Sequence, residues 1–327
     1  MCSIIFILVF SQSEIIGFPF LKIEVGARPV GMGGAFTAVS DDPYAVFWNP
    51  GGMGNIRRNG VSFHTMNVFW IGNYTSGTAV FKIGKRMSIG ILGGVLSAQD
   101  IERTETGEEI GTFNYYDTYL GVSGGYLIFK NLSFGTTAKF AYTKIHDYSA
   151  GAMLMDIGIL YVLNKYVTLG TALQNLGTPR IFYKEFEFPP ITIRNGIAFN
   201  FYFEKNHLIL SADLTTNNRG EIGVSTGFEL RIHTKYEVME KFINPNDISG
   251  IFIRGGYRTG TGEGVGAGFS LGIGVEYEIL KDWSFVIDAV SLSHGFLGMT
   301  QRASFSILYE PTKERKKRSR IGRRRSK

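Results

Sequence analysis

The sequence predicts an all-β protein: a 14-stranded antiparallel transmembrane β-barrel with an N-terminal hatch segment. Apolar residues alternate with polar or very small residues over fourteen long runs, and short turns that carry a lysine recur between the runs. Alternation with period two indicates a sheet with one apolar face. An even number of runs fits an antiparallel barrel whose two chain ends lie on the same side.

The amino-acid composition agrees with a β-barrel. Glycine accounts for 42 of the 327 residues and aromatic residues for 14%, whereas only 19% of the residues are charged, below the usual share of about a quarter. No stretch of about 18 uninterrupted apolar residues is present, so we do not expect a transmembrane helix. If the chain spans a membrane, it must do so as a closed barrel, in which every backbone polar group has a partner.

Residues 1–17 are predicted to be a signal peptide. An apolar run from Ile4 to Phe10 is followed by polar residues, as near the end of a secretory signal, but the usual positive charge is missing. A wrongly assigned start codon or a first buried strand would explain the same run. Cys2 is the only cysteine, which excludes an intrachain disulfide and a cysteine-based metal site.

Residues 18–58 are predicted to form a hatch inside the barrel. Residues 26–53 read GARPVGMGGAFTAVSDDPYAVFWNPGGM, which is too rich in glycine for a long helix but apolar enough to pack against other groups. The lumen widens with the number of strands, so side chains alone cannot fill a wide barrel with a glycine-lined wall. A segment that enters the lumen explains this mixture of residues.

The barrel is predicted over residues 59–310. In the run 264–279 apolar residues occupy one face and Gly, Ser and Glu the other, and the runs 191–203 and 131–143 alternate in the same way. A soluble sandwich would alternate too, but its strands average five or six residues, whereas crossing a bilayer at a tilt takes about ten. The fourteen runs are 60–70, 74–84, 87–98, 115–128, 131–146, 150–163, 166–176, 191–203, 206–216, 221–232, 250–258, 264–279, 283–293 and 302–310.

The connections between the runs fall into two classes. Tight turns that carry a lysine lie on one side of the barrel and longer loops on the other, which is the pattern of outer-membrane barrels. The tight turns centre on Lys85, Lys130, Lys165, Lys205 and Lys281, and the longer loops are 99–114, 177–190 and 294–301. Aromatic residues beside the tight turns are expected to form an interfacial girdle, namely Tyr126, Phe129, Tyr161, Tyr202, Tyr277 and Trp283.

Two segments depart from this pattern. The connection 233–249 should be short but is long, and the helical spacing of Tyr236, Met239 and Phe242 predicts a small amphipathic helix on the rim.

Residues 311–327 are predicted to be a basic, disordered tail, because the last fifteen residues hold ten Lys or Arg against one acidic residue. The rest of the chain holds 24 basic and 27 acidic residues, so the body is mildly acidic. The alternative role of the tail is contact with an anionic surface such as lipid headgroups or nucleic acid.

Two motifs resemble those of a known family. The run GARPVGMGGAFTAVSDDPYAVFWNPGGM resembles the N-terminal signature of the PorV/PorQ outer-membrane proteins, which are similar in architecture to FadL-type fatty-acid transporters, and ALQNLG at 172–177 is also similar to a piece of that family. The resemblance extends through Tyr309 and implies a 14-stranded barrel with an N-terminal hatch in the outer membrane of a Gram-negative-type (diderm) bacterium. The usual Asn-Pro-Ala-Gly-Leu of the family is replaced here by Asn-Pro-Gly-Gly-Met at 49–53, and the basic tail is another departure.

The resemblance also implies which residues of the hatch hold it and gate a ligand. Carried over position by position, these are Gly26, Arg28, Gly31, Gly33, Gly34, Asp41, Asp42, Trp48, Asn49 and Pro50.

Other interpretations of these residues have less support. The glycines at 31–34 could belong to a nucleotide-binding loop, but no strand precedes them and no Gly-Lys-Ser/Thr is present. Asp41 and Asp42 could be an acid–base pair or calcium ligands, but an isolated pair followed by Pro43 is more typical of a turn. Ser62 and His64 could belong to an esterase, although two residues on one strand are no oriented triad. We therefore expect no enzyme activity, no catalytic residue, no metal and no cofactor.

Gly93 and Gly94 mark a possible opening in the wall. Adjacent glycines weaken a strand and permit a bulge or a kink, which could open a lateral path from the lumen to the bilayer. Close packing of the wall against the hatch would explain the pair equally well. Gly124 and Gly125 allow the same two interpretations.

Passage of hydrophobic small molecules across the outer membrane is the leading function predicted. The alternative is a non-enzymatic component of protein secretion, as the resemblance implies for type IX secretion, which binds cargo or partner subunits. An apolar patch beside the hatch would favour the channel, whereas a uniformly polar lumen would favour the second role. The expected partners are outer-membrane lipid, a hydrophobic small molecule and envelope or secretion proteins, and we do not expect nucleic acid.

Overall fold

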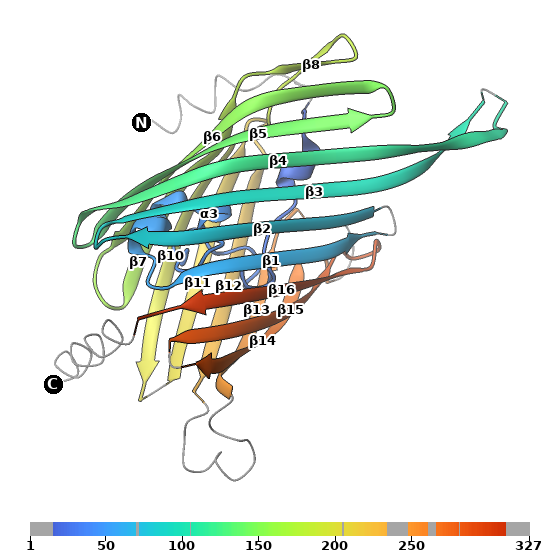
Figure 1. Ribbon diagram of the computed structural model, residues 1–327. Helices are drawn as coiled ribbons and strands as arrows, with labels where there is room; N and C mark the ends of the chain where they lie inside the picture. The colour runs from blue at the N-terminus through green and yellow to red at the C-terminus, as the bar shows by residue number, and fades with distance from the viewer. Residues whose placement is uncertain are drawn as a thin grey trace.

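A computed structural model describes residues 16–69, 72–104, 106–204, 206–233, 248–260, 266–280 and 282–311. In this part of the chain fourteen strands close into one antiparallel barrel, in which β1 pairs with β16 (Figure 1). Neighbouring strands follow the order of the chain, except that β7 pairs with β10 across a separate hairpin of β8 and β9. The predicted fold class is confirmed.

The strands of the barrel and the short helices before it have the following bounds. The barrel strands are β1 (Asn59–Val68), β2 (Gly72–Ile83), β3 (Met87–Arg103), β4 (Glu109–Phe129), β5 (Leu132–Ile145), β6 (Tyr148–Val162), β7 (Val167–Gly177), β10 (Thr192–Phe203), β11 (Asn206–Asn217), β12 (Ile222–Ile232), β13 (Ile248–Arg258), β14 (Phe269–Leu280), β15 (Trp283–Ser293) and β16 (Met299–Tyr309). The other elements are η1 (Pro19–Lys22), α2 (Ala27–Gly31), α3 (Ala45–Trp48), η2 (Pro50–Asn55), β8 (Arg180–Phe182) and β9 (Glu185–Glu187). None of the helices in the described part of the chain is long and apolar enough to span a membrane.

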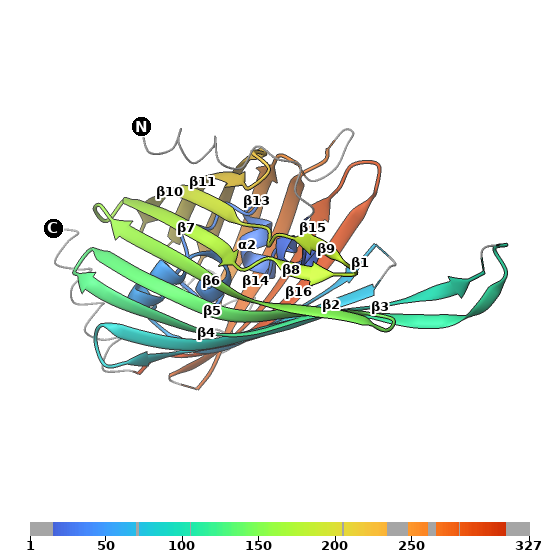
Figure 2. The ribbon, with the colours of Figure 1, turned by 90° about the horizontal axis from the view of Figure 1, so that it is seen from above.

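The larger differences from the prediction concern two predicted loops and one strand. The predicted loop 99–114 is mostly strand, because β3 and β4 stay paired from Met87 out to Arg103 and Glu109. This hairpin projects well beyond the rest of the barrel (Figures 1 and 2). The predicted loop 177–190 contains the β8–β9 hairpin. The predicted strand 264–279 begins only at Phe269, since residues 266–268 form a turn in which Gly266 and Gly268 have positive φ.

The apolar face of each strand points away from the lumen, as the alternation requires. On β14, Leu271 is 73% exposed and Ile273 is 65% exposed, whereas the inward-facing Glu276 is 3% exposed. On β5, Phe134 and Phe140 are exposed on the outside. Apolar surface of this extent is typical of a protein that contacts lipid.

The two ends of the barrel differ. The Lys-turn end carries the tight turns between β2 and β3, β4 and β5, and β6 and β7, whereas the loop end carries the projecting hairpin and the β8–β9 hairpin. The predicted girdle residues lie at the Lys-turn end, and five of the six are exposed: Tyr126, Phe129, Tyr202, Tyr277 and Trp283. The predicted signal peptide up to residue 15, the predicted helix in 234–247 and the tail from 312 onward lie outside the described residues.

Small residues on the inner wall let the hatch approach the strands closely. η2 packs against β4, β5 and β6, and α2 packs against β13 to β16. A Cβ at Gly125 would overlap Met53, and a Cβ at Gly135 or Gly158 would overlap the segment from Asn49 to Gly51. Gly125 therefore packs closely against the hatch, as one of the two interpretations of the Gly124–Gly125 pair requires. By contrast, a Cβ at Gly124 would meet nothing within 4 Å.

We therefore expect Gly135→Ala to destabilise the protein by about 1–3 kcal/mol, because the added methyl overlaps the carbonyl of Pro50. Gly124→Ala is the matched control on the neighbouring strand, and its effect should be small because the site is open. The measurement is the temperature at which the barrel unfolds in detergent, followed by heat-modifiable gel migration. Equal unfolding temperatures for the two variants would contradict this packing.

Candidate functional site

The hatch (residues 18–58) runs through the lumen from one end of the barrel to the other (Figure 1). Ile16, just before it, forms a β-bridge with Phe188 at the loop end, and the N–H of Gly17 donates to the carbonyl of Phe188 over 2.9 Å. At its other end η2 lies near the Lys-turn end, and the chain continues from there into β1. Residues 18–58 therefore extend along the lumen between its two ends.

Trp48, Asn49 and Pro50 fix the hatch to itself and to the wall. The indole N–H of Trp48 donates to the carbonyl of Val25 over 2.9 Å. The amide of Asn49 donates to the carbonyl of Thr37 over 2.8 Å and to that of Ile159 on β6 over 3.0 Å, and its oxygen accepts from the N–H of Gly51. Pro50 starts η2, where its missing N–H costs nothing.

Arg28 is the centre of a buried ion-pair network. Its guanidinium lies 2.6 Å from Asp41, 2.8 Å from Asp42 and 2.7 Å from Glu229 on β12. Glu229 also pairs with Arg254 on β13 over 2.6 Å. These contacts bind the hatch to β12, whereas Asn49 contacts β6, so the two sets of contacts hold it at separate parts of the wall.

The Asp41–Asp42 pair is part of this network and of a turn. The carboxylate of Asp42 accepts a hydrogen bond from the N–H of Tyr44 over 2.8 Å, as in a turn that begins with aspartate. Burial raises the pKa of Asp42 to about 6, although Arg28 opposes the shift. Both carboxylates face Arg28, and among the described residues no group of three or more His, Cys, Asp or Glu is arranged to hold a metal ion.

Three of the four glycines predicted in the hatch have backbone conformations that favour glycine. Gly26, Gly33 and Gly34 have positive φ, which other residues rarely adopt. A Cβ at Gly33 would also overlap main-chain atoms of two barrel strands. Gly31 ends α2 in an ordinary helical conformation. A Cβ added at Gly31 would lie 3.5 Å from the Cα of Gly272 on β14. The four glycines therefore shape the hatch and its seat.

Two residues of the wall contact the hatch although no role was predicted for them. Asp213 on β11 accepts hydrogen bonds from the N–H groups of Phe36 and Thr37 over 3.1 and 2.9 Å. In the ALQNLG motif, the amide of Gln174 donates to the carbonyls of Phe47 and Trp48 over 2.6 and 3.0 Å. The resemblance to PorV/PorQ proteins pointed to this motif. Nothing in the sequence distinguished Asp213 from the many other inward-facing polar residues.

The next residue of the motif, Asn175, sits at an irregularity in the wall. It has a φ of 59°, and the pairing of β6 with β7 shifts register between Met155 and Ile157. The N–H of Asn175 donates to Asp156 over 2.7 Å, and Lys139 donates to the side-chain oxygen of Asn175 over 2.7 Å. A buried lysine–aspartate pair thus holds the bulge in place.

At Gly93 and Gly94, by contrast, the wall is regular. The pairing of β3 with β2 and with β4 continues through both glycines without a register shift. A Cβ at Gly94 would overlap the ring of Tyr119 on β4, so the glycine makes room for a wall residue. A lateral opening at this pair stays a prediction.

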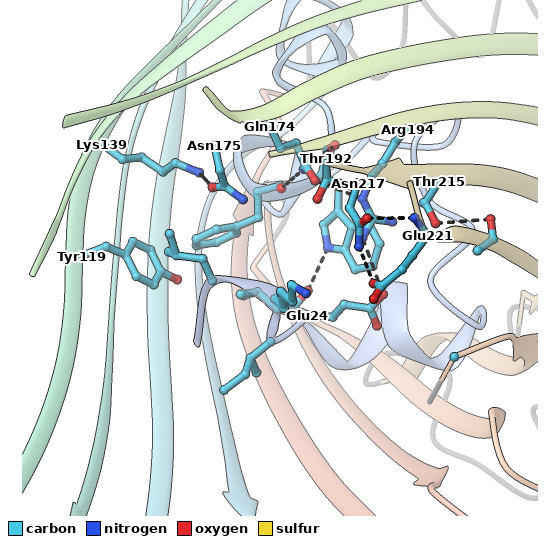
Figure 3. A pocket seen from close by; sticks show the side chains of 18 of the residues that line it. Glu24, Tyr119, Lys139, Gln174, Asn175, Thr192, Arg194, Thr215, Asn217 and Glu221 are labelled. Atoms are coloured by element: carbon cyan, nitrogen blue, oxygen red, sulfur yellow. Dashed lines mark hydrogen bonds and ion pairs between the residues drawn. The ribbon is translucent and has the colours of Figure 1, made fainter. Parts of the chain in front are cut away.

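Two adjoining cavities form a vestibule at the loop end, and Figure 3 shows one of them. They have volumes of about 310 and 330 Å³ and share Lys22, Ile23 and Glu24 of the hatch and Arg194, Thr215, Gly223, Thr259 and Gly260 of the barrel. A smaller cavity of about 90 Å³ lies on the other side of the hatch, beside Arg28 and Glu229. The vestibule has an apolar side that includes Phe47, Trp48 and Tyr119 and a polar side that includes Gln174, Asn175 and Thr192.

Ser62 and His64 make separate contacts. The hydroxyl of Ser62 is hydrogen-bonded to that of Ser306 over 2.7 Å, and Nδ1 of His64 lies 3.3 Å from the hydroxyl of Ser304. Both residues therefore face β16, and neither activates the other.

We expect Arg28→Met to destabilise the protein by about 3–5 kcal/mol, because it removes the cation that Asp42 and Glu229 share and leaves Glu229 with Arg254 alone. Arg103→Met is the matched control: Arg103 pairs with Glu109 over 2.8 Å on the projecting hairpin, where both side chains are exposed. Its loss should cost about 0–1 kcal/mol. Thermal unfolding in detergent measures the stability of both variants. A loss of stability for Arg28→Met that is no greater than that for Arg103→Met would contradict the role of the network.

No protein-family model matches the chain, and no characterised protein matches its sequence. The resemblance to PorV/PorQ proteins therefore stays a prediction. Solved structures do match. The toluene transporter TodX of Pseudomonas putida superposes with a TM-score of 0.57 at 10% identity, over 90% of this chain and 98% of TodX.

Two further solved structures agree in fold. A FadL homologue of Pseudomonas aeruginosa matches with a TM-score of 0.54 at 11% identity, over 91% of this chain and all of the homologue (100%). The toluene transporter TbuX of Ralstonia pickettii matches with a TM-score of 0.54 at 14% identity, over 87% of this chain and 97% of TbuX. The chain therefore shares the fold of FadL-type outer-membrane transporters over nearly its whole length.

Proposed function

We propose that the protein is an outer-membrane channel for hydrophobic small molecules and that the hatch closes it. In this proposal the loop end faces the exterior and the Lys-turn end faces the periplasm, as in barrels with short periplasmic turns. The observation that carries the proposal is the position of the hatch, which fills the lumen between the vestibule and the smaller cavity. The likeness in fold to toluene transporters and to a FadL homologue supports it.

The vestibule offers what such a ligand needs at the start of its path. The hatch contributes the side chains of Leu21, Ile23 and Trp48, and the wall contributes Tyr74 and Tyr119. Burial of apolar surface against these groups stabilises a ligand by about 25 cal/mol per Å², with loose specificity. In this proposal passage requires the hatch to move, because the hatch contributes residues to the lining of both the vestibule and the smaller cavity.

A second candidate function is the binding of envelope or secretion proteins. It is favoured by the projecting hairpin of β3 and β4, whose pairing with β2 ends at Ala98 and with β5 at Tyr115. Beyond these residues both edges of the hairpin are open to added strands. Replacement of residues 99–114 by a two-residue turn should then abolish co-purification of envelope proteins from native membranes and leave small-molecule uptake unchanged.

Transport itself is tested by uptake of radiolabelled toluene into cells that express the protein. Thr215→Trp should slow uptake several-fold, because Thr215 lies where the two cavities of the vestibule share lining (Figure 3). The matched control is Leu214→Trp, which places the same side chain at an exposed position on the outside of the same strand. Uptake no faster than in cells without the protein would contradict the channel, as would equal rates for the two variants.

A further inference from the structure

Lys139, Asp156 and Asn175 come from three neighbouring strands and meet in the wall of the vestibule. Nζ of Lys139 on β5 lies 2.7 Å from Oδ1 of Asn175 on β7 and 2.8 Å from Oδ2 of Asp156 on β6. Figure 3 shows the side chain of Lys139 pointing at Asn175. An amine, a carboxamide and a carboxyl group therefore share one site, although Lys139 and Asn175 are 36 positions apart in the chain.

The site is buried in the wall. Lys139 is 7% exposed and Asp156 is 1% exposed. The strand neighbours of Lys139 are apolar or lack a side chain: Leu154 on β6, which is itself buried, and Gly121 on β4. A Cβ at Gly121 would lie 2.9 Å from Cγ of Lys139, so this glycine makes room for the lysine. Burial disfavours two separate charges, and Lys139 can therefore pass its proton to Asp156 and become a neutral amine.

Hydrogen bonds hold the carboxamide of Asn175 in one orientation. Its Nδ2 donates to the carbonyl of Pro190 over 3.2 Å, which leaves Oδ1 facing Lys139. Its main-chain N–H donates to Oδ1 of Asp156 over 2.7 Å, so Asp156 contacts both the amine and the asparagine. Nζ of Lys139 need only move from Oδ1 to the neighbouring Cγ to attack it. Reactants held in this way react far faster than the same groups free in solution.

We propose that Lys139 and Asn175 join in an amide bond between their side chains, a modification that the folded barrel performs on itself with Asp156 as proton carrier. The lone pair of the neutral Nζ attacks Cγ of Asn175, and the bond from Cγ to Nδ2 breaks. Asp156 takes a proton from Nζ and gives one to Nδ2, which leaves as ammonia through the vestibule. One amine and one carboxamide thus become one amide and one ammonia molecule, with no oxidant or other reactant.

The bond ties β5 to β7 across β6, where the pairing of the strands is irregular. The pairing of β6 with β7 shifts register beside Asp156, and β7 ends at Gly177, before the chain enters the β8–β9 hairpin. Like a disulfide, a cross-link of this kind restricts the unfolded chain and so favours the folded barrel. It also keeps this part of the wall closed whatever passes through the lumen.

Two variants with the same atomic composition test the bond. Lys139→Arg removes the nucleophile but keeps a positive charge beside Asp156, and Lys144→Arg makes the same replacement at an exposed position of β5. Intact-mass spectrometry compares the two full chains after extraction from membranes in detergent. Lys139→Arg should be heavier than Lys144→Arg by the mass of one ammonia molecule, because only Lys144→Arg still forms the bond.

Peptide mapping locates the bond in the wild type. Trypsin should release residues 131–144 and 166–180 as one branched peptide, since the modified Lys139 is no longer a cleavage site. Asp156→Asn removes the proton carrier, so its digest should contain the two segments as separate peptides. The map of the wild type stays decisive if a variant fails to fold.

Equal masses for the two arginine variants, or separate peptides from the wild type, would overturn the proposal. The three side chains would then be joined by hydrogen bonds and an ion pair alone. A mass difference of one water molecule in place of ammonia would also overturn it, because the amine would then have attacked a carboxyl group and not Asn175.

Discussion

A closed wall of fourteen strands encloses more space than its inward side chains can fill, and the rest of the structure depends on this constraint. The wall carries glycine where the hatch comes closest, at Gly125, Gly135 and Gly158, so backbone packs on backbone there. The hatch in turn contains only short helices of four to six residues, and its shape follows the inner surface of the barrel. Closure of the barrel also removes every long strand edge except at the projecting hairpin.

Directional polar contacts determine where the hatch sits. Asn49 and Gln174 connect it to β6 and β7, and Arg28 connects it to Glu229 on β12. Such contacts require defined geometry, and buried charges are costly when their partners are removed, so alternative positions of the hatch are disfavoured. Apolar packing alone would allow the segment to slide. A segment held in this way has one preferred position in the lumen.

Local patterns predicted the wall well, because alternation and turn residues are properties of neighbouring positions. The extension of β3 and β4 was missed because residues 99–114 are mostly polar and do not alternate with period two over a long run. In the hatch, the sequence indicated Arg28, Asn49 and the glycines. Two wall partners could not be identified: Glu229, which pairs with Arg28, and Asp213, which accepts from Phe36 and Thr37, since each contact joins positions more than 170 residues apart. Inward-facing polar residues on many strands look alike in the sequence.

The central claim is that the hatch is a removable plug in a rigid barrel. Hydrogen–deuterium exchange of the protein in lipid vesicles, with and without saturating toluene, tests it most directly. The account predicts that amides of residues 18–58 are protected without toluene, as the strands are, and that toluene increases their exchange while the strands stay protected. Hatch amides that exchange freely in both conditions, or whose protection toluene leaves unchanged, would contradict the account.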